Sequence, residues 1–128
     1  EICLVDSNTD FESKTKKLFL VPANKFSLLK SKKIDLFVNI ASFQEMNYKQ
    51  INNYFNIIKH NKSYLYNCNR EEKVLPDGKR IRFDHYPFGS SKILFKEECA
   101  WHKRTYIPIY PFVKQYEGPH IHSLCKFN

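Results

Sequence analysis

The pattern of hydrophobic and polar positions changes most sharply between Ile34 and Arg70. Ile34–Ala41 is a nearly continuous apolar run, which is typical of a strand that is covered on both faces in a parallel sheet. The chain turns polar over Ser42–Met46. After a helical segment, Ser63–Cys68 repeats the pattern of a buried strand.

The segment between these two runs has the signals of an amphipathic helix. Asn47 is a suitable N-cap, and Gln50 stands three residues later, where its side chain completes a capping box. Met46 and Ile51 occupy the positions of a hydrophobic staple around that cap. One apolar stripe recurs at helical spacing, formed by Ile51, Tyr54, Phe55 and Ile58. Strand, helix and strand in this order predict a right-handed parallel crossover.

Ligands of such sheets bind beyond the carboxyl ends of the strands. Two polar segments leave the predicted strands at that edge, Ser42–Glu45 after the first and Asn67–Arg70 at the end of the second. These segments are therefore the first candidates for chemistry.

Shorter elements are expected elsewhere. Pro76-Asp77-Gly78 between two strand-like runs is a hairpin signal, because Pro presets φ and Gly supplies positive φ. Pro108 and Pro111 restrict Ile107–Val113 to an edge strand or an extended segment. Further predicted strands are Glu1–Val5, Leu18–Val21, Lys73–Leu75, Lys79–Phe83 and Lys92–Phe95, and a short helix or covered loop is predicted around Phe26–Leu29. No boundary is marked, so residues 1–128 are expected to form one domain.

Composition narrows the class of protein. The formal charge of +8 suggests anionic partners, but the lysines are scattered and no nucleic-acid motif is present. A Lys-, Asn- and Ile-rich composition also reflects AT-rich coding sequence, so we do not expect a nucleic-acid partner.

No apolar run is long enough to span a membrane, and no signal peptide is visible. The four cysteines do not form a disulfide scaffold, and we expect free thiols and a cytoplasmic location.

Two segments carry a resemblance to a known family. The stretch Asp35–Met46, with its Asn-x-x-Ser-x-x-Glu-Met pattern, and the stretch Tyr64–Arg70 resemble the sugar O-methyltransferases. These are class I S-adenosylmethionine-dependent enzymes. The resemblance continues weakly through Leu75–Gly78, Phe83–Pro87 and Cys99–His102. It implies a seven-stranded Rossmann-like sheet with helices on both sides, and S-adenosylmethionine at its carboxyl edge. The implied activity is O-methylation of a free, nucleotide-linked or glycan-bound sugar in surface polysaccharide biosynthesis.

The family's glycine-rich cofactor loop is missing. This chain has glycines only at 78, 89 and 118, all after the predicted crossover. In the family, the strand that carries the loop lies beside the strand matching Ile34–Ala41. We therefore expect a partial methyltransferase sheet, mostly parallel with antiparallel hairpins in its second half. It would be the carboxyl-terminal part of a larger domain or a degenerate product, with an exposed edge at Ile34–Ala41 open to a pairing partner.

The resemblance also implies roles for individual residues. The predicted catalytic residues are Glu45, His85 and His102, with Glu45 as the base that accepts the proton of a sugar hydroxyl. The predicted cofactor-binding residues are Asp6, Ala23, Asn24, Asn39, Ala41 and Ser42. The predicted substrate-binding residues are Gln44, Asn69, Arg70 and Tyr86.

Each role has a structural alternative. Glu45 is also placed where an acid is favoured by the helix dipole. Asn39 is equally well explained as a hydrogen-bonded polar residue of the strand, and Asn24 as a turn residue. Arg70 beside two glutamates has the pattern of a solvated side chain, and single histidines are often structural.

Two further hypotheses concern a zinc site and a non-catalytic function. Cys99-x-x-His102 and His120-x-His122-x-x-Cys125 contain thiols and imidazoles that suit zinc. The resemblance already accounts for Cys99–His102, so we expect no metal. The alternative to the methyltransferase is a non-catalytic basic module that binds RNA or protein.

Overall fold

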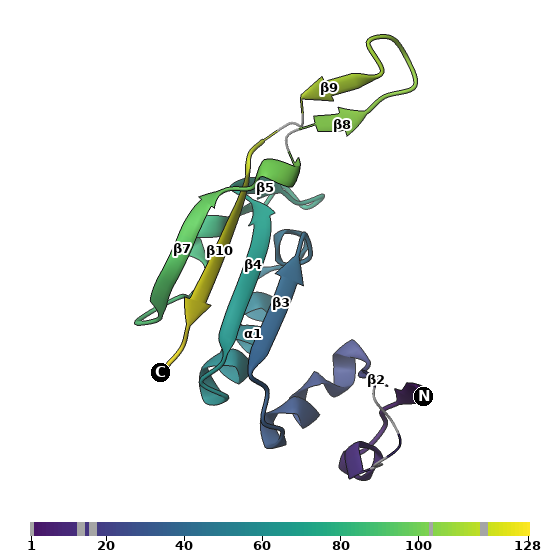
Figure 1. Cartoon of the computed structure of the whole chain (residues 1–128), viewed down its shortest axis with the longest axis vertical. Helices are drawn as coiled ribbons and strands as arrows, with labels where there is room; N and C mark the ends of the chain where they lie inside the picture. Colours follow the sequence, from purple (N-terminus) through teal and green to yellow (C-terminus); the bar gives the residue numbers. More distant parts are fainter. Residues whose placement is uncertain (1, 13–14, 16–17, 103, 116–117) are drawn as a thin grey trace. The chain divides into compact units, whose positions relative to one another are not determined.

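The computed structural model describes residues 2–12, 15, 18–102, 104–115 and 118–128. The chain divides into two compact units, Glu1–Lys33 and Ile34–Asn128, where the sequence marked no boundary. The protein is a mixed α/β structure in which small sheets dominate and helices are few, as Figure 1 shows.

The first unit is built on a parallel pair of strands, β1 (Ile2–Leu4) and β2 (Leu18–Leu20). The 3₁₀ helix η1 (Asn8–Glu12) lies between them in the chain, and η2 (Ala23–Ser31) follows β2. Both predicted strands are thus confirmed, except that Glu1 lies outside the described residues. Of the two alternatives for Phe26–Leu29, a short helix or a covered loop, the structure contains the helix, as part of η2.

The second unit contains a four-stranded sheet in the order β3-β4-β10-β7. These strands are β3 (Leu36–Ile40), β4 (Tyr64–Arg70), β7 (Lys92–Glu98) and β10 (His120–Lys126). β3 and β4 are parallel, and β10 is antiparallel to both β4 and β7. Three of the four strands therefore share one direction, and the last strand in sequence lies between two of them.

The predicted strand–helix–strand crossover is present. β3 leads through the 3₁₀ turn η3 (Phe43–Glu45) into α1 (Tyr48–His60) and then β4. The capping box forms as predicted: the Gln50 N–H donates to Asn47 Oδ1 at 3.0 Å, and the Asn47 N–H donates to Gln50 Oε1 at 3.1 Å. In Figure 1, α1 lies behind the sheet.

The core of this unit lies on the α1 side of the sheet. The apolar stripe of α1 supplies Ile51, Phe55 and Ile58, all buried. Sheet and loop residues complete this cluster: Phe43, Leu65, Ile81, Phe83, Tyr86, Cys125 and Phe127. Many of the contacts are between aromatic rings, such as Phe55 with Phe88 at a centroid distance of 5.5 Å.

The prediction that Ile34–Ala41 is covered on both faces is wrong for the described residues. Leu36, Val38 and Ile40 are 52%, 60% and 55% exposed, because α1 covers only one face of β3. β3 is also an edge strand, with β4 as its only neighbour in the described sheet. The apolar run was therefore correctly assigned to a strand, but periodicity alone did not show how many layers cover it.

Two hairpins follow β4. β5 (Glu72–Val74) and β6 (Arg80–Arg82) pair antiparallel around Gly78, whose φ of 82° fits the predicted turn. η4 (Phe83–His85) comes next. β8 (Arg104–Tyr106) and β9 (Val113–Gln115) form the second hairpin.

The prediction for Ile107–Val113 is wrong for most of its length. The chain reverses direction there instead of running extended. The Ile107 N–H donates to the Phe112 carbonyl at 2.9 Å, and Phe112 has a φ of 62°. The two prolines exclude a central strand, as predicted, but they mark a loop.

β10 was not predicted from the sequence. Its residues alternate between the two faces of the sheet: Cys125 and Phe127 belong to the core cluster on the α1 side, and His120 and His122 lie on the opposite face. Among the described residues, no helix has the length and apolar character needed to cross a membrane.

Candidate functional site

The carboxyl ends of β3 and β4 meet at one edge of the sheet because the two strands are parallel. The chain leaves β3 at Ala41, which has a φ of 57°. This conformation is rare for a residue other than glycine. The Ala41 N–H still donates to the Cys68 carbonyl at 2.8 Å, so the turn toward η3 starts directly at the end of the ladder.

Buried amide side chains hold this turn. Asn69 Oδ1 accepts the backbone N–H of Gln44 at 3.1 Å, and Gln44 Oε1 accepts the backbone N–H of Arg70 at 2.7 Å. Asn69 Nδ2 donates to Asn39 Oδ1 at 2.8 Å and to Asn67 Oδ1 at 2.5 Å. The network fixes the η3 turn against the end of β4.

Asn39 and Ser42, both predicted to bind the cofactor, are part of the same network. Asn39 Nδ2 donates to Ser42 Oγ, and Asn39 Oδ1 accepts the Phe43 N–H at 3.3 Å. The structural alternative for Asn39, a hydrogen-bonded polar residue in the strand, is therefore confirmed. The amides of Gln44 and Asn69 are likewise used within the protein, while contacts of these residues with cofactor or substrate remain predictions.

Glu45 lies at the end of η3 and is about half exposed. Its Oε1 is 3.2 Å from Lys73 Nζ and 3.3 Å from Gln44 Nε2. Both described contacts use the same carboxylate oxygen. These two contacts orient a carboxylate that stays open to solvent on one side, and its role as a base remains a prediction.

The three predicted catalytic residues have separate partners. Glu45 pairs with Lys73, whereas His85 Nδ1 lies 3.4 Å from the Tyr48 hydroxyl oxygen and the His85 ring is exposed. His102 contacts two cysteine thiols. No described contact joins the three side chains into one group.

The remaining predicted substrate residues differ in their environment. The Tyr86 ring is buried in the core against Phe43 and Phe83, and burial raises the pKa of its hydroxyl. Tyr86 is therefore a core residue, and its contact with a substrate remains a prediction. Arg70 is partly buried at the end of β4, opposite His120 in the neighbouring strand.

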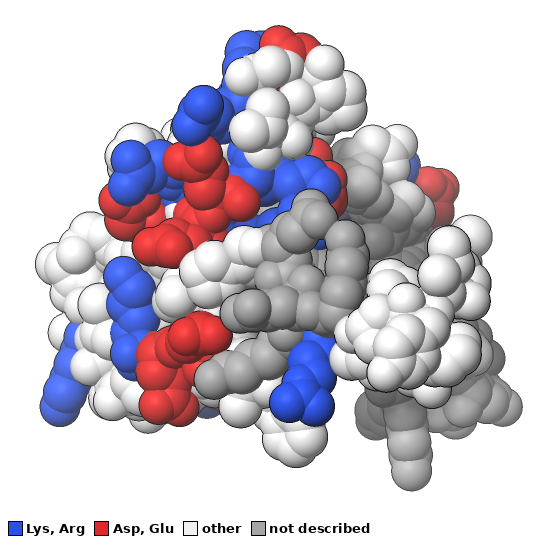
Figure 2. All heavy atoms as spheres, turned by 90° about the horizontal axis from the view of Figure 1, so that it is seen from above, with Lys and Arg blue, Asp and Glu red and all other residues white. Residues whose placement is uncertain are grey.

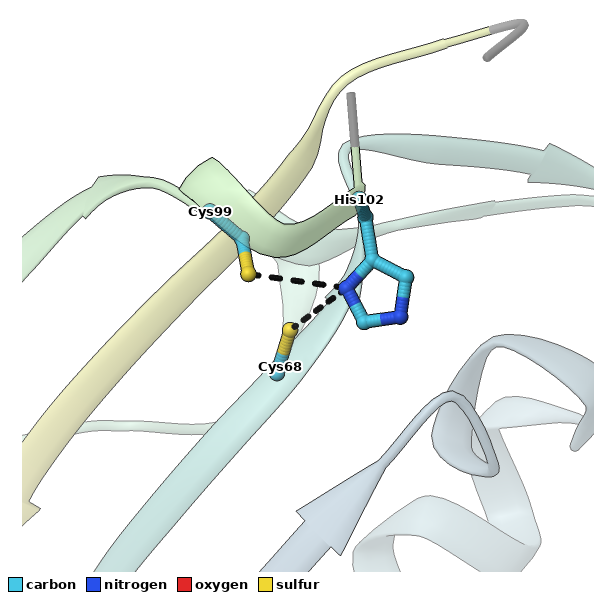
Figure 3. Close-up of side chains that lie close together, drawn as sticks. All are labelled: Cys68, Cys99 and His102. Carbon is cyan, nitrogen blue, oxygen red and sulfur yellow. Dashed lines mark hydrogen bonds between the residues drawn. The ribbon is translucent and has the colours of Figure 1, made fainter. Parts of the chain in front are cut away.

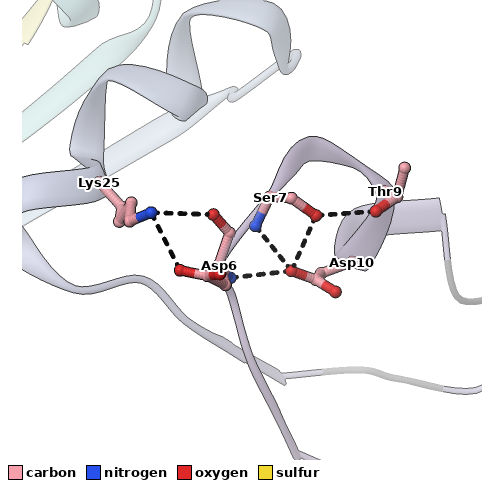
Figure 4. Close-up of polar contacts among 5 residues, drawn as sticks. All are labelled: Asp6, Ser7, Thr9, Asp10 and Lys25. Carbon is pink, nitrogen blue, oxygen red and sulfur yellow. Dashed lines mark hydrogen bonds and ion pairs between the residues drawn. The ribbon is translucent and has the colours of Figure 1, made fainter.

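Three predicted cofactor residues belong to the first unit. Asp6 follows β1, and Ala23 and Asn24 begin η2 after β2, so all three lie beyond the carboxyl ends of its parallel pair. The Asp6 carboxylate is 2.9 Å from Lys25 Nζ and is mostly exposed (Figure 4). The structure thus places these residues at a two-stranded pair separate from the four-stranded sheet, and their contact with a cofactor remains a prediction.

The face of the large sheet opposite α1 holds a cluster of thiols and imidazoles. Cys68 on β4 and Cys99 after β7 are buried, and His102 ends the 3₁₀ turn η5 (Ala100–His102). His102 Nδ1 lies 3.5 Å from Cys99 Sγ and 3.8 Å from Cys68 Sγ, and Figure 3 shows both sulfurs pointing to that nitrogen.

The surroundings of the cluster are unfavourable for charge on Cys68 and on His120. Burial raises the pKa of Cys68 to about 12, and the neighbouring Cys99 thiol adds to the rise. The His120 ring stacks on the His102 ring with 4.4 Å between centroids. Burial also lowers the pKa of His120 to about 4, with His102 and Arg70 adding to the shift.

Cys68 was not predicted to belong to this cluster. The sequence spacing grouped His120, His122 and Cys125 instead, and alternation along β10 places Cys125 on the other face of the sheet. His122 contacts Tyr66 and Glu97. A strand pairing between residues far apart in sequence was needed to identify Cys68, and no local spacing signals it.

Comparisons with known proteins identify no relative: no protein-family description, no curated protein and no solved structure matches this chain.

Proposed function

We propose that this chain forms part of an S-adenosylmethionine-dependent methyltransferase domain that methylates a sugar hydroxyl in the cytoplasm, as a step of surface polysaccharide synthesis. The observation that carries the proposal is the geometry at the end of the parallel pair. The η3 turn with Glu45 is fixed to the end of β4 through Asn69 and Gln44, at the sheet edge where the resemblance expects cofactor and substrate.

The sheet itself supports this proposal. Its crossover, the common direction of β3, β4 and β7, and the two edge segments fit a doubly wound α/β domain, whose ligands bind at this edge. In such a domain, helices cover both faces of the sheet. The proposal therefore explains the exposed Leu36, Val38 and Ile40 as a face that other segments of the methyltransferase domain cover.

In this function the chain supplies positioning and a base. S-adenosylmethionine, when bound, supplies the methyl group on a sulfonium. Glu45 accepts the proton of the sugar hydroxyl as the new C–O bond forms, and Lys73 and Gln44 orient its carboxylate. Within the second unit, Ser42 after β3 is the candidate for holding the cofactor. The family's glycine-rich loop is not among these 128 residues, so the proposal requires another segment to provide it.

The basic binding module receives less support. In and around the β5–β6 hairpin, four basic side chains pair with acids: Lys73 with Glu45, Lys79 with Asp77, Arg80 with Glu72, and Arg82 with Asp84. On the face drawn in Figure 2, basic and acidic side chains are interleaved. A nucleic-acid surface instead gathers unpaired basic groups along one stripe.

The test is transfer of a radiolabelled methyl group from S-adenosylmethionine to a panel of nucleotide sugars and oligosaccharides, using the protein as its gene encodes it. Glu45→Gln should lower turnover by roughly 10²–10⁴-fold and leave cofactor affinity nearly unchanged. Glu71→Gln, which removes an exposed charge from the same edge, is the matched control. No transfer to any acceptor together with no cofactor binding would refute the function, whereas normal turnover of folded Glu45→Gln would refute only the role of Glu45.

A further inference from the structure

The buried cluster on the face opposite α1 has the composition of a metal site. Among the described residues, Cys68, Cys99 and His102 are the group whose ligand atoms all lie within 4.8 Å of one another. Two of them are buried and the third is partly buried. They come from β4 and from the turn after β7, which flank β10 on its two sides.

The distances match those between the ligands of one tetrahedral zinc ion. With Zn–S near 2.3 Å and Zn–N near 2.0–2.1 Å, tetrahedral angles place a sulfur and a nitrogen ligand about 3.6 Å apart. The observed distances from His102 Nδ1 are 3.5 Å to Cys99 Sγ and 3.8 Å to Cys68 Sγ. The three ligand atoms are therefore close enough together to share one ion.

Hydrogen bonding accounts for part of this arrangement, because the Cys68 and Cys99 thiols also hydrogen-bond to each other. A single imidazole nitrogen has either one lone pair or one proton, so it makes a good hydrogen bond to only one of two sulfurs. Figure 3 nevertheless shows both sulfurs converging on Nδ1. A divalent cation between the three atoms would satisfy all of them at once, and two thiolates would balance its charge.

The backbone around the cluster is well held. The Cys99 N–H donates to the His120 carbonyl at 2.7 Å, and the His102 N–H approaches the Cys99 carbonyl at 3.4 Å. The His120 ring stacks on His102 with an angle of 20° between the planes. Because a ring nitrogen directs its lone pair within the ring plane, two stacked rings do not aim at the same ion. His120 therefore fixes the orientation of His102 and is not a fourth ligand in this arrangement.

We propose that Cys68 Sγ, Cys99 Sγ and His102 Nδ1 bind a thiophilic divalent cation, zinc in the cell, with the fourth position taken by solvent. Thiolate and imidazole ligands select zinc over magnesium or calcium. The ion would join the end of β4 to the turn after β7 across β10. The site is independent of the proposed methyltransferase activity, because its evidence is the ligand geometry alone.

The test uses reduced protein freed of metal and titrated with Co²⁺, whose thiolate charge-transfer and tetrahedral ligand-field bands report the ligands. We expect one Co²⁺ per chain, displaced by one Zn²⁺. Cys68→Ser, Cys99→Ser and His102→Gln should each weaken binding by at least about 10²-fold, since loss of a direct ligand exceeds the 10–100-fold cost of losing an outer-shell partner. Cys125→Ser, a buried thiol on the other face, is the matched control and should bind normally.

A second measurement on the unsubstituted protein does not depend on whether the variants fold. One equivalent of Zn²⁺ should slow alkylation of Cys68 and Cys99, mapped by mass spectrometry, and leave Cys3 and Cys125 unchanged. The proposal is overturned if reduced protein gives no thiolate band, if the band survives folded Cys68→Ser or Cys99→Ser, or if zinc does not protect these two thiols. Formation of a Cys68–Cys99 disulfide in air by protein that binds no Co²⁺ when reduced would identify a redox pair instead.

Discussion

Asn69 Oδ1 accepts the backbone N–H of Gln44 at 3.1 Å, which ties the end of β4 to the turn that follows β3. The two residues are 25 positions apart in sequence, and both are buried. The side chain of Gln44 returns a bond to the backbone at the end of β4. This reciprocal pair fixes the loop that carries Glu45, so its integrity can be tested directly.

Replacing Asn69 by Leu should destabilise the second unit. The apolar side chain leaves the Gln44 N–H, Asn39 Oδ1 and Asn67 Oδ1 without this partner in a buried region. Each buried polar group left unsatisfied costs about 1–3 kcal/mol. Urea unfolding followed by circular dichroism measures the loss, with the exposed Asn52→Leu in α1 as the control. A loss below about 0.5 kcal/mol for Asn69→Leu would contradict the network.

Truncations on the two faces of the sheet should differ strongly. Leu65 on β4 is fully buried on the α1 side, whereas Val38 on β3 is 60% exposed on the other face. Leu65→Ala should cost about 2–5 kcal/mol of unfolding free energy. Val38→Ala should change it by about 0.5 kcal/mol or less, as for ordinary surface positions. Equal losses in denaturant unfolding would show that a further layer covers β3 in solution.

Hydrogen exchange should show that β3 is an edge strand. In a parallel ladder, successive residues alternate between facing the neighbour and facing away, and the Ala41 N–H faces β4. The amides of Phe37 and Asn39 should therefore exchange slowly, and those of Leu36, Val38 and Ile40 quickly. NMR-detected exchange at several protein concentrations measures both sets. Slow exchange of the second set would reveal a pairing partner on this edge.

Protonation of the Asp10 carboxylate should destabilise the first unit at acidic pH. Its Oδ2 accepts the backbone N–H groups of Ser7 and Asp6, each at 2.8 Å (Figure 4). The Ser7 and Asp6 N–H donors lower the pKa of this carboxyl below its ordinary value of 3.8. Because the folded-state pKa is depressed, the stabilisation is present above pH 3.8 and is lost as the pH falls through the folded-state pKa.

The measurement is an NMR titration of the Asp6 and Ser7 amide protons. Both should shift with one midpoint below 3.8. Asp10→Asn should abolish the shift while leaving the first unit folded. A midpoint at or above 3.8, or a shift that persists in Asp10→Asn, would contradict the hydrogen bonds to this carboxylate.

Local signals in the sequence were sufficient for the central crossover. The apolar run before Ser42, the Asn47–Gln50 capping box and the stripe from Ile51 to Ile58 predicted a strand and a helix that the structure contains. The β5–β6 hairpin was equally local, since Pro76 and Gly78 define its turn. Each of these features depends on residues within a few positions of one another, where propensity and capping chemistry act directly.

Contacts between segments far apart in sequence decided the order of the strands and the composition of the cluster. The sequence did not predict that β10 lies between β4 and β7, because this depends on contacts between segments far apart in the chain. The same pairing brings Cys68 to Cys99 and His102 and separates Cys125 from them. An apolar run indicates that a strand is buried somewhere, but only packing shows that α1 covers one face of β3 and leaves Leu36, Val38 and Ile40 exposed. The sequence by itself thus determined the local elements, and the tertiary structure decided which side chains meet.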